Sequence, residues 1–240
     1  MRLFGTSGIR GLVGPELTPQ LVAEVGMALA SLRGPGTYVL ARDPRTTSHI
    51  LAMSFSSGVM SCGGDVLDLG LLPTGALAFL TRELGAKAGC MITASHNPPE
   101  YNGLKFFRPN SAPFWPEEQK AIEELVGKKD FKMVSWDAVG NYECSDEADR
   151  YIEALVGAVE LGRRWKVVLD PGCGSASLLA PRIFRALGCE VVALNAEPDG
   201  HFPARSPDPR PDTVRDLCSA VRELGADVGF AYDGDADRMV

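Results

Sequence analysis

The sequence predicts an α/β fold with two similar three-layer domains whose mixed sheets are mostly parallel, the second domain being incomplete at its C-terminus. Short apolar segments alternate with longer helical segments along the 240 residues, an order typical of right-handed βαβ units. The apolar content of 45% is enough to fill a substantial core. The last predicted strand is followed by a charged loop and then only by Met239 and Val240, so the second block is expected to be unfinished.

The first block of alternating segments runs to about residue 126. Thr18 and Pro19 have the character of a helix N-cap and first helical residue, and the glycines and proline of 34–36 end that helix. We expect, in order, helix 20–33, strand 37–41, helix 46–61, strand 65–69, helix 74–84, strands 88–93 and 104–107, and helix 116–126. The stretch 127–145 is more polar and without clear period, so it predicts no element.

The second block repeats this alternation. We expect, in order, helix 146–161, strand 166–169, a glycine-rich turn, helix 178–187, strand 190–194, a proline-rich loop over 197–211, helix 212–224 and strand 227–232. In open parallel sheets, ligands bind at the carboxyl ends of the strands. Polar residues that directly follow a strand are therefore candidates for a functional site.

Charge and composition argue against nucleic-acid-binding, membrane-spanning and secreted proteins. The formal net charge of −7 argues against nucleic acid as a partner, because phosphate backbones are bound by clustered positive charge. No apolar run of about 18 residues is present, so no membrane association is expected. The first residues lack the apolar stretch of a secretory signal, which predicts a cytoplasmic protein. The six cysteines form no Cys-x-x-Cys pair and are expected to be reduced and mostly buried.

Three carboxylates follow the last predicted strand, in the segment Asp233-Gly234-Asp235-Ala236-Asp237-Arg238. A turning backbone would place them around one point, and oxygen ligands without Cys or His favour Mg²⁺ over Zn²⁺. An EF-hand loop is opposed by Arg238, because the sixth position of that loop requires glycine. A solvated acidic turn is the alternative, but packed carboxylates repel one another, so a bound cation is the better interpretation.

A second polar segment, Thr93-Ala94-Ser95-His96-Asn97-Pro98, follows the apolar residues 88–92. Ser95 would then lie at the same sheet edge as the aspartates. An unassisted serine hydroxyl is a poor nucleophile, and adjacent serine and histidine side chains diverge, so no hydrolase dyad is expected. The Gly-x-Ser-x-Gly pattern is also absent. On these residues alone, a turn capped by serine and histidine is an alternative.

Several segments, taken together and in order, resemble the signatures of the α-D-phosphohexomutase superfamily, which includes phosphoglucomutase and phosphomannomutase. They are Phe4-Gly5-Thr6-Ser7-Gly8-Ile9-Arg10-Gly11, Thr93 to Pro98, Asn102-Gly103-Leu104-Lys105, His201-Phe202-Pro203 with Pro207, and Asp233 to Arg238. The resemblance covers the whole chain and implies a phosphoserine-loop domain over 1–145 and a metal-loop domain over 146–240. It also implies an isomerase that acts as an intramolecular phosphotransferase.

The resemblance implies that Ser95 carries a phosphoryl group between the 1- and 6-positions of a hexose phosphate, through a bisphosphate intermediate. Mg²⁺ would be held by Ser95, Asp233, Asp235 and Asp237. The ion and Arg238 would neutralise charge on the phosphoryl oxygens. Glucose and mannose phosphates are the first expected substrates, and glucosamine phosphate, as in phosphoglucosamine mutase, is the alternative.

Other motif positions receive roles from the same resemblance. Lys105 corresponds to the general acid/base, and an amine accepts a proton only when neutral, a state that burial or neighbouring cations favour. Arg10 corresponds to a second catalytic or phosphate-facing group, and because arginine stays charged we expect an electrostatic or proton-relay role. His96 would orient the nucleophile or its phosphate, and Thr6 and Ser7 would bind phosphate.

Two departures from the family are visible. Ala236 stands where many relatives have glycine, and because a Cβ disfavours positive φ we expect an ordinary backbone conformation there. The family's third and fourth domains are absent, so we expect a truncated form that needs a C-terminal half or a second chain and turns over sugars poorly alone. Within the motifs, Arg42-Asp43-Pro44-Arg45 resembles a family Asp-x-Arg element and is expected to brace the active-site loops by an ion pair.

Two alternatives come from other classes of protein. Residues 167–176, with the turn Asp170-Pro171-Gly172-Cys173-Gly174, resemble motif I of an S-adenosylmethionine-dependent methyltransferase. Such enzymes place an acidic residue at the end of the next strand, which here ends at Asn195, so we expect this turn to be a packing or hinge element instead. A non-catalytic fragment that keeps the fold is the other alternative, against which the intact motifs argue.

Overall fold

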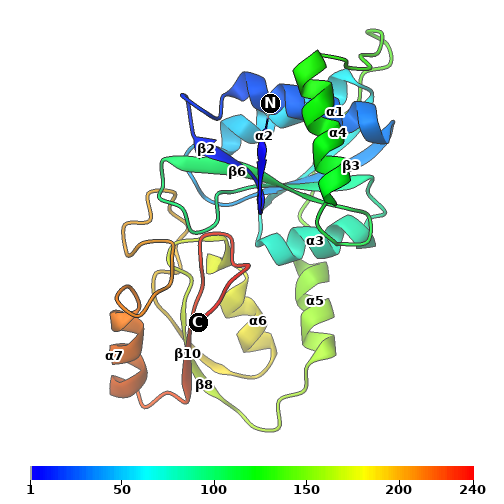
Figure 1. Cartoon of the computed structure of the whole chain (residues 1–240). Coiled ribbons are helices and arrows are strands. Elements are labelled where there is room, and N and C mark those ends of the chain that lie inside the picture. Colours follow the sequence, from blue (N-terminus) through cyan, green and yellow to red (C-terminus); the bar gives the residue numbers. More distant parts are fainter. Residues whose placement is uncertain (1) are drawn as a thin grey trace.

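The computed structural model describes residues 2–240, which form two β-sheets with helices on both faces of each (Figure 1). The larger sheet contains β1 (Phe4–Gly5), β2 (Gly8–Leu12), β3 (Gly36–Arg42), β4 (Gly64–Leu71), β5 (Ala88–Ile92), β6 (Tyr101–Phe107) and β7 (Tyr142–Cys144). Its strand order is β1-β2-β6-β5-β3-β4-β7. The pairs β5–β3, β3–β4 and β4–β7 are parallel, and the pairs β1–β2, β2–β6 and β6–β5 are antiparallel. The predicted α/β class with mixed, mostly parallel sheets is confirmed.

Helices cover both faces of this sheet. The helices α1 (Pro19–Arg33), α2 (Ser48–Ser61) and α4 (Pro116–Lys128) pack on one face, and α3 (Thr74–Glu83) and α5 (Ala148–Ala158) pack on the other. Successive strand residues alternate between these layers, because Leu40 of β3 belongs to the first core and Val39 to the second. A strand buried on both faces reads as a continuous apolar run, which is why 37–41 is recognisable in the sequence.

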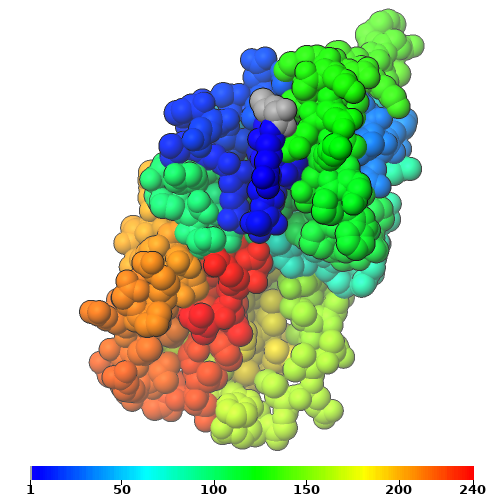
Figure 2. Space-filling model, viewed as in Figure 1, coloured from blue at the N-terminus to red at the C-terminus, as the bar shows by residue number. Residues whose placement is uncertain are grey.

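The C-terminal unit is built around three parallel strands. The strands β8 (Lys166–Asp170), β9 (Glu190–Ala193) and β10 (Val228–Ala231) pair in the order β10-β8-β9. Helix α6 (Ala180–Ala186) packs on one face through Phe184, and α7 (Arg215–Glu223) packs on the other through Leu217. After β10 the chain turns back, and Met239 bridges antiparallel to Tyr232. The C-terminal residues (red) lie at the surface where the two units meet (Figure 2).

A shared core joins the two units. Ile152 of α5 and Leu179, which precedes α6, belong to the same buried cluster as Leu77 and Leu80 of α3. β7 ends at Cys144 and α5 begins at Ala148, and α5 contacts both units, so a domain division after residue 145 stays a prediction. None of the helices within residues 2–240 is long and apolar enough to span a bilayer.

The structure differs from the expected elements in several places. The strands β1, β2 and β7 do not coincide with any predicted segment, because they are short or exposed. β2 and β7 pair with strands distant in sequence, and β1 pairs with β2 in a tight hairpin. A 3₁₀ turn, η1 (Ser175–Ser177), precedes α6, which therefore begins later than expected. Helix α7 begins at Arg215, because Thr213 Oγ1 caps a turn by accepting from the N–H of Arg210 at 2.8 Å. The six cysteines are free, and four of them are buried.

Candidate active site

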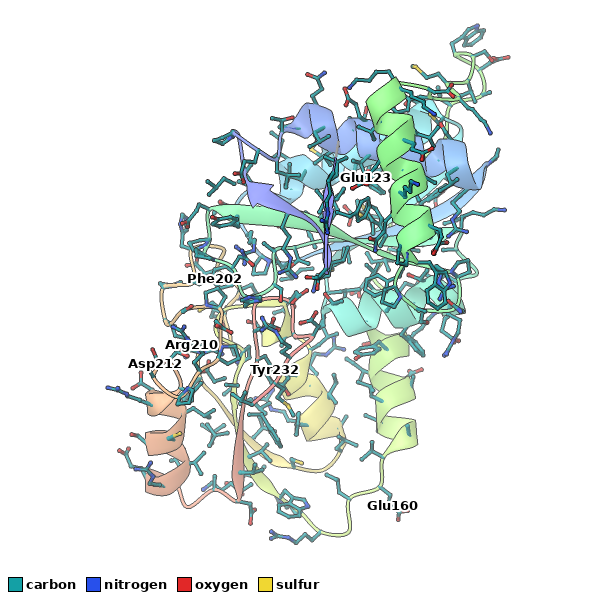
Figure 3. All side chains as sticks on the ribbon, in the orientation of Figure 1. Glu123, Glu160, Phe202, Arg210, Asp212 and Tyr232 are labelled. Carbon is teal, nitrogen blue, oxygen red and sulfur yellow. The ribbon has the colours of Figure 1, made fainter. Side chains whose placement is uncertain are left out.

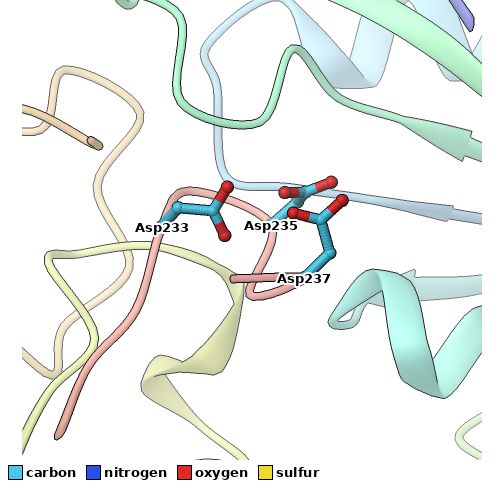
Figure 4. Close-up of side chains that lie close together, drawn as sticks. All are labelled: Asp233, Asp235 and Asp237. Atoms are coloured by element: carbon cyan, nitrogen blue, oxygen red, sulfur yellow. The ribbon is translucent and has the colours of Figure 1, made fainter. Parts of the chain in front are cut away.

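The loop after β10 brings three carboxylates together. Asp233, Asp235 and Asp237 each offer an oxygen, and these oxygens lie within 4.8 Å of one another (Figure 4). Asp233 and Asp235 are fully buried, whereas Asp237 is partly open to solvent. The loop closes on itself, since the N–H of Ala236 donates to the carbonyl of Asp233 at 3.1 Å. The three side chains therefore converge on one point, as a turning backbone requires.

The backbone conformation at Ala236 differs from the one expected from the sequence. Its φ is 57°, so the prediction of an ordinary backbone conformation at this position is wrong. Ala236 is the left-handed residue in the turn that brings the three carboxylates together. For an L-residue with a Cβ this conformation costs roughly 1–2 kcal/mol. The loop geometry is thus kept at the expense of local strain.

Ser95 lies directly against the aspartate loop. Its Oγ–H donates to Asp233 Oδ2 at 2.6 Å, although the two residues are 138 positions apart. Its own N–H donates to Thr93 Oγ1 at 2.8 Å, and its φ is 55°. A Cβ on Gly234 would lie 2.5 Å from the Ser95 carbonyl oxygen, so this close approach of two loops requires glycine. The nucleophile candidate and the carboxylates form one cluster.

Two basic side chains complete the cluster. Arg238 Nη2 lies 3.0 Å from Asp233 Oδ2 and 3.3 Å from Ser95 Oγ. Lys105 Nζ donates to Asp235 Oδ2 at 2.5 Å and to Asp237 Oδ2 at 2.6 Å. Lys105 is buried as expected, but its charged neighbours are carboxylates rather than cations.

Thr74 is a member of the site that the sequence analysis missed. It begins α3 at the carboxyl end of β4, and its Oγ1–H donates to Asp235 Oδ2 at 2.6 Å. Its N–H donates to the Asp235 carbonyl at 2.9 Å. The sequence could have indicated Thr74 as a site residue. Pro73-Thr74 starts a helix directly after a strand, and the end of that strand lies at the same sheet edge.

Asp235 uses its two carboxylate oxygens differently. Oδ2 accepts from both Thr74 and Lys105, whereas Oδ1 is buried and has no hydrogen-bond partner among residues 2–240. A buried, unpartnered carboxylate oxygen is costly unless a further ligand satisfies it. This oxygen and the all-carboxylate donor set fit a hard divalent cation such as Mg²⁺.

The pKa values of the two buried aspartates move in opposite directions. Burial, followed by repulsion from Asp235, raises the pKa of Asp233 to about 6. Burial also opposes ionisation of Asp235, but the Lys105 ammonium and the Thr74 hydroxyl outweigh it and hold the pKa of Asp235 below its ordinary value. Lys105 therefore keeps part of the carboxylate cluster charged inside the protein.

The remaining motif residues surround this cluster. Arg10 Nη1 donates to Asn97 Oδ1 at 3.3 Å, which places its guanidinium beside the Ser95 loop. His96 is partly buried, and burial followed by the Arg238 charge lowers its pKa. Thr6 and Ser7 are exposed and line a cavity of about 300 Å³ together with Lys105, Thr74 and Asp237.

Arg45 and Asp43 form the expected ion pair. Arg45 Nε lies 3.0 Å from Asp43 Oδ2, and both side chains are fully buried. Arg45 Nη2 also donates to the carbonyls of Ser95 at 2.9 Å and Asn97 at 2.7 Å. The pair therefore holds the backbone of the Ser95 loop. Arg42 instead pairs with Asp68 at 2.9 Å.

The glycine-rich turn after β8 lies beneath the aspartate loop. The N–H of Ser175 donates to the Gly234 carbonyl at 2.9 Å, and a Cβ on Gly174 would lie 2.8 Å from the same oxygen. Asn195, at the end of β9, donates to Asp170 Oδ1 at 3.0 Å and so faces the protein rather than a nucleoside. The turn acts as a packing element under the carboxylates.

Two family models match the chain. The one described as phosphoglucomutase/phosphomannomutase, alpha/beta/alpha domain I, matches residues 1–133, and the one described as domain II matches residues 149–240. The chain is 47% identical over 240 residues to a probable phosphoglucosamine mutase of Methanothermobacter thermautotrophicus. It is 42% identical over 248 residues to a phosphoglucomutase/phosphomannomutase of Thermococcus kodakarensis. Each alignment covers 100% of this chain but 54% of the relative.

A crystal structure of a phosphoglucomutase/phosphomannomutase family protein from Burkholderia thailandensis superposes with a TM-score of 0.91 at 34% identity. The match covers 99% of this chain and 54% of that one. The chain therefore spans about half the length of the curated relatives and the solved structure that it matches.

Proposed function

The chain belongs to the phosphoglucomutase/phosphomannomutase family, and we propose that it forms the part of a mutase that carries the transferred phosphoryl group on Ser95. The substrate would be a hexose 1- or 6-phosphate. The observation that carries the proposal is the 2.6 Å hydrogen bond from Ser95 Oγ to Asp233, within a cluster that fits a divalent cation. The curated relatives are mutases, which are isomerases.

The proposed reaction has two half-reactions. In the first, the P–O bond to Ser95 Oγ breaks and a new bond forms to the free hydroxyl oxygen of the sugar phosphate, whose proton passes to a base. In the second, the other phosphoryl group of the resulting bisphosphate returns to Ser95 Oγ, and the released sugar oxygen regains a proton. Such transfers depend mainly on positioning and charge neutralisation.

The cluster supplies that neutralisation. Mg²⁺ would be held by Asp233, Asp235 and Asp237 together with an oxygen at Ser95, and when bound it withdraws charge from phosphoryl oxygens. Arg238 Nη2, 3.3 Å from Ser95 Oγ, is placed to bind an oxygen of a phosphate on that atom. Because arginine stays charged, this contact needs no proton transfer.

We assign the proton transfer to Lys105. Lys105 lines the cavity that Thr6 and Ser7 also line, so a sugar hydroxyl bound there would lie near it. Lys105 donates to two carboxylates in the structure, as an ammonium does. It must therefore pass a proton to one of these carboxylates or to solvent, and release the contacts, before the neutral amine can accept the proton of the sugar hydroxyl. Arg10 would add positive charge beside the phosphate, and Thr6 and Ser7 would donate hydrogen bonds to it.

The substrate's substituent at the 2-position separates two candidate activities. Glucose and mannose phosphates are the first candidates, as in the relative from Thermococcus kodakarensis. Glucosamine phosphate is the second, and the 47% identical relative named a phosphoglucosamine mutase favours it. Further substrate contacts would come from the remainder of a longer protein or from a second chain, because relatives are about twice as long.

The test is direct transfer to the serine. The 240-residue chain is incubated with Mg²⁺ and hexose 1,6-bisphosphates of glucose, mannose and glucosamine. Intact mass should rise by ~80 Da, peptide mapping should place the group on Ser95, and Ser95→Ala should gain nothing. Phosphate found elsewhere, or no transfer from any donor, would reject the proposal, and the fastest donor identifies the sugar.

A further inference from the structure

One arginine organises the backbone around Ser95. Arg45 is 2% exposed, and its Nη atoms donate to three carbonyls of the loop that follows β5 and to one at the start of β6. The acceptors are Ser95 at 2.9 Å, Asn97 at 2.7 Å, Pro98 at 2.5 Å and Tyr101 at 2.9 Å. Because Ser95 has a φ of 55°, its backbone depends on such contacts to stay in a conformation that serine rarely adopts.

A phenylalanine from the C-terminal unit covers this arginine. The Cζ of Arg45 lies 5.1 Å from the ring centroid of Phe202, a geometry in which the ring face attracts the guanidinium. Phe202 is 5% exposed and lies where the two units meet (Figure 3). Its own Cζ lies 3.5 Å from the position that a Cβ on Gly234 would take, so the ring also packs against the aspartate loop.

The turn that carries Phe202 is tightly held. Its φ is 51°, which is rare for an aromatic residue, and its N–H donates to the Asp199 carbonyl at 3.1 Å. A Cβ on Gly200 would lie 2.3 Å from the Pro44 carbonyl oxygen and 2.7 Å from Arg45 Cα. Non-glycine residues in such conformations persist only where the surroundings over-determine them, and they gather at functional sites.

We propose that Phe202 is a positioning residue for phosphoryl transfer. Its ring shields the Arg45 guanidinium from water and fixes its plane, so docking of the C-terminal unit sets the backbone that presents Ser95. The same ring sets the distance between the Ser95 loop and the aspartate loop. The inference rests on the proposed function, in which Ser95 accepts the phosphoryl group. A phenylalanine that merely fills space would act through its volume alone.

The test separates the ring face from the ring volume. Phe202→Leu removes the aromatic face but keeps an apolar side chain. Replacement of Phe202 by 3,5-difluorophenylalanine keeps the shape but weakens the negative ring face. Phe184, an aromatic residue of the same unit whose ring centroid lies 5.4 Å from that of Phe230 in the core on the α6 face, receives the same two changes as a control.

Two readouts are compared with the unchanged chain. Amide hydrogen exchange is followed at Asn97 and Tyr101, whose N–H groups donate to carbonyls within the loop. The rate of phosphoryl transfer to Ser95 from hexose 1,6-bisphosphate is followed by intact mass. We expect Phe202→Leu to raise exchange and lower the transfer rate about tenfold each, with a smaller change in the same directions for the fluorinated ring.

The outcomes distinguish the inference from the proposed function. The positioning role of the ring face would be overturned if the Phe202 and Phe184 variants showed equal amide exchange and equal transfer rates. It would also be overturned if Phe202→Leu had an effect that the fluorinated ring did not share. Absence of transfer to Ser95 in the unchanged chain would instead reject the proposed function. In that case the exchange contrast still decides whether Phe202 holds the Ser95 loop.

Discussion

Individual residues shape the site in ways that their neighbours in the sequence do not predict. Thr74 and Lys105 both donate to Oδ2 of Asp235, which leaves Oδ1 buried and without a partner among residues 2–240 and therefore available to a cation. Ala236 adopts a left-handed backbone in spite of its Cβ, because the carboxylates converge only if the loop turns there. The first feature depends on a contact between segments far apart in the chain, and the second on the closure of one short loop.

Thr74→Val is expected to weaken Mg²⁺ binding about tenfold, because it deletes a hydrogen bond to a charged group while it keeps the side-chain shape. Calorimetric titration with Mg²⁺ measures the change. Thr81→Val is the matched control, since Thr81 lies in the same helix, is fully buried, and donates only to the Leu77 carbonyl. Equal Mg²⁺ affinities in the two variants would contradict the role of Thr74.

Ala236→Gly is expected to raise the free energy of unfolding by about 1 kcal/mol or less. Relief of the left-handed strain outweighs the extra freedom that glycine gains in the unfolded chain. The same change at Ala154, an exposed residue inside α5, should lower it by about 1 kcal/mol. Denaturant unfolding measures both changes in the free energy of unfolding. Changes of the same sign at Ala236 and Ala154 would contradict backbone strain at Ala236.

At the scale of elements, the site is assembled at the carboxyl ends of strands from both sheets. Ser95 follows β5, Thr74 follows β4, and the aspartate loop follows β10. The glycine-rich turn after β8 supports the aspartate loop from below through the Ser175 N–H. Because a turn with side chains could not approach so closely, the glycine pattern that resembles a cofactor motif here serves backbone packing.

Gly174→Ala is expected to distort the aspartate loop. Gly174 has a φ of −85°, so alanine meets no backbone penalty there, but its Cβ would lie 2.8 Å from the Gly234 carbonyl oxygen. Overpacking of this kind costs about 1–3 kcal/mol and should weaken Mg²⁺ binding as well. Gly157→Ala, in α5 with open space around it, should be neutral or stabilising. If Gly174→Ala and Gly157→Ala had the same Tm and the same Mg²⁺ affinity, the close contact at Gly174 would not support the aspartate loop.

At the scale of the whole molecule, the seam between the two units combines a polar cluster with an apolar core. The N-terminal unit contributes Ser95, Lys105 and Thr74 to the contacts with the aspartates, which the C-terminal unit contributes. Behind them, Ile152 of α5 and Leu179 join the core under α3. A cation at the aspartates would therefore stabilise the joined arrangement, because only the folded state presents all its ligands.

The stabilisation by Mg²⁺ should depend on pH. The pKa of Asp233 is raised to about 6, so in metal-free protein this carboxyl favours the folded state at low pH and loses that contribution as pH rises from its ordinary value through about 6. Mg²⁺ competes with this proton, so its effect should grow over the same range. Thermal unfolding with and without Mg²⁺ at pH 5 and pH 7.5 should show the larger increase in Tm at pH 7.5. Asp233→Asn should remove most of this difference, and an equal increase at both pH values would contradict the assignment.

The sequence by itself determined the alternation of strands and helices, the position of most elements and the polar segments that follow strands. These follow from hydrophobic periodicity and local backbone preference, which act over a few residues. The resemblance of its motifs to a known family added the expected roles of Ser95 and of the three aspartates.

Only the tertiary structure decided the strands β1, β2 and β7, the left-handed turn at Ala236, and the placement of Thr74 and Phe202 against loops of the other unit. It also showed carboxylates rather than cations around Lys105. Apart from the β1–β2 hairpin and the turn at Ala236, these features are fixed by contacts between segments distant in sequence. Local propensity does not determine them, because their free energy arises only when the chain packs into its tertiary structure.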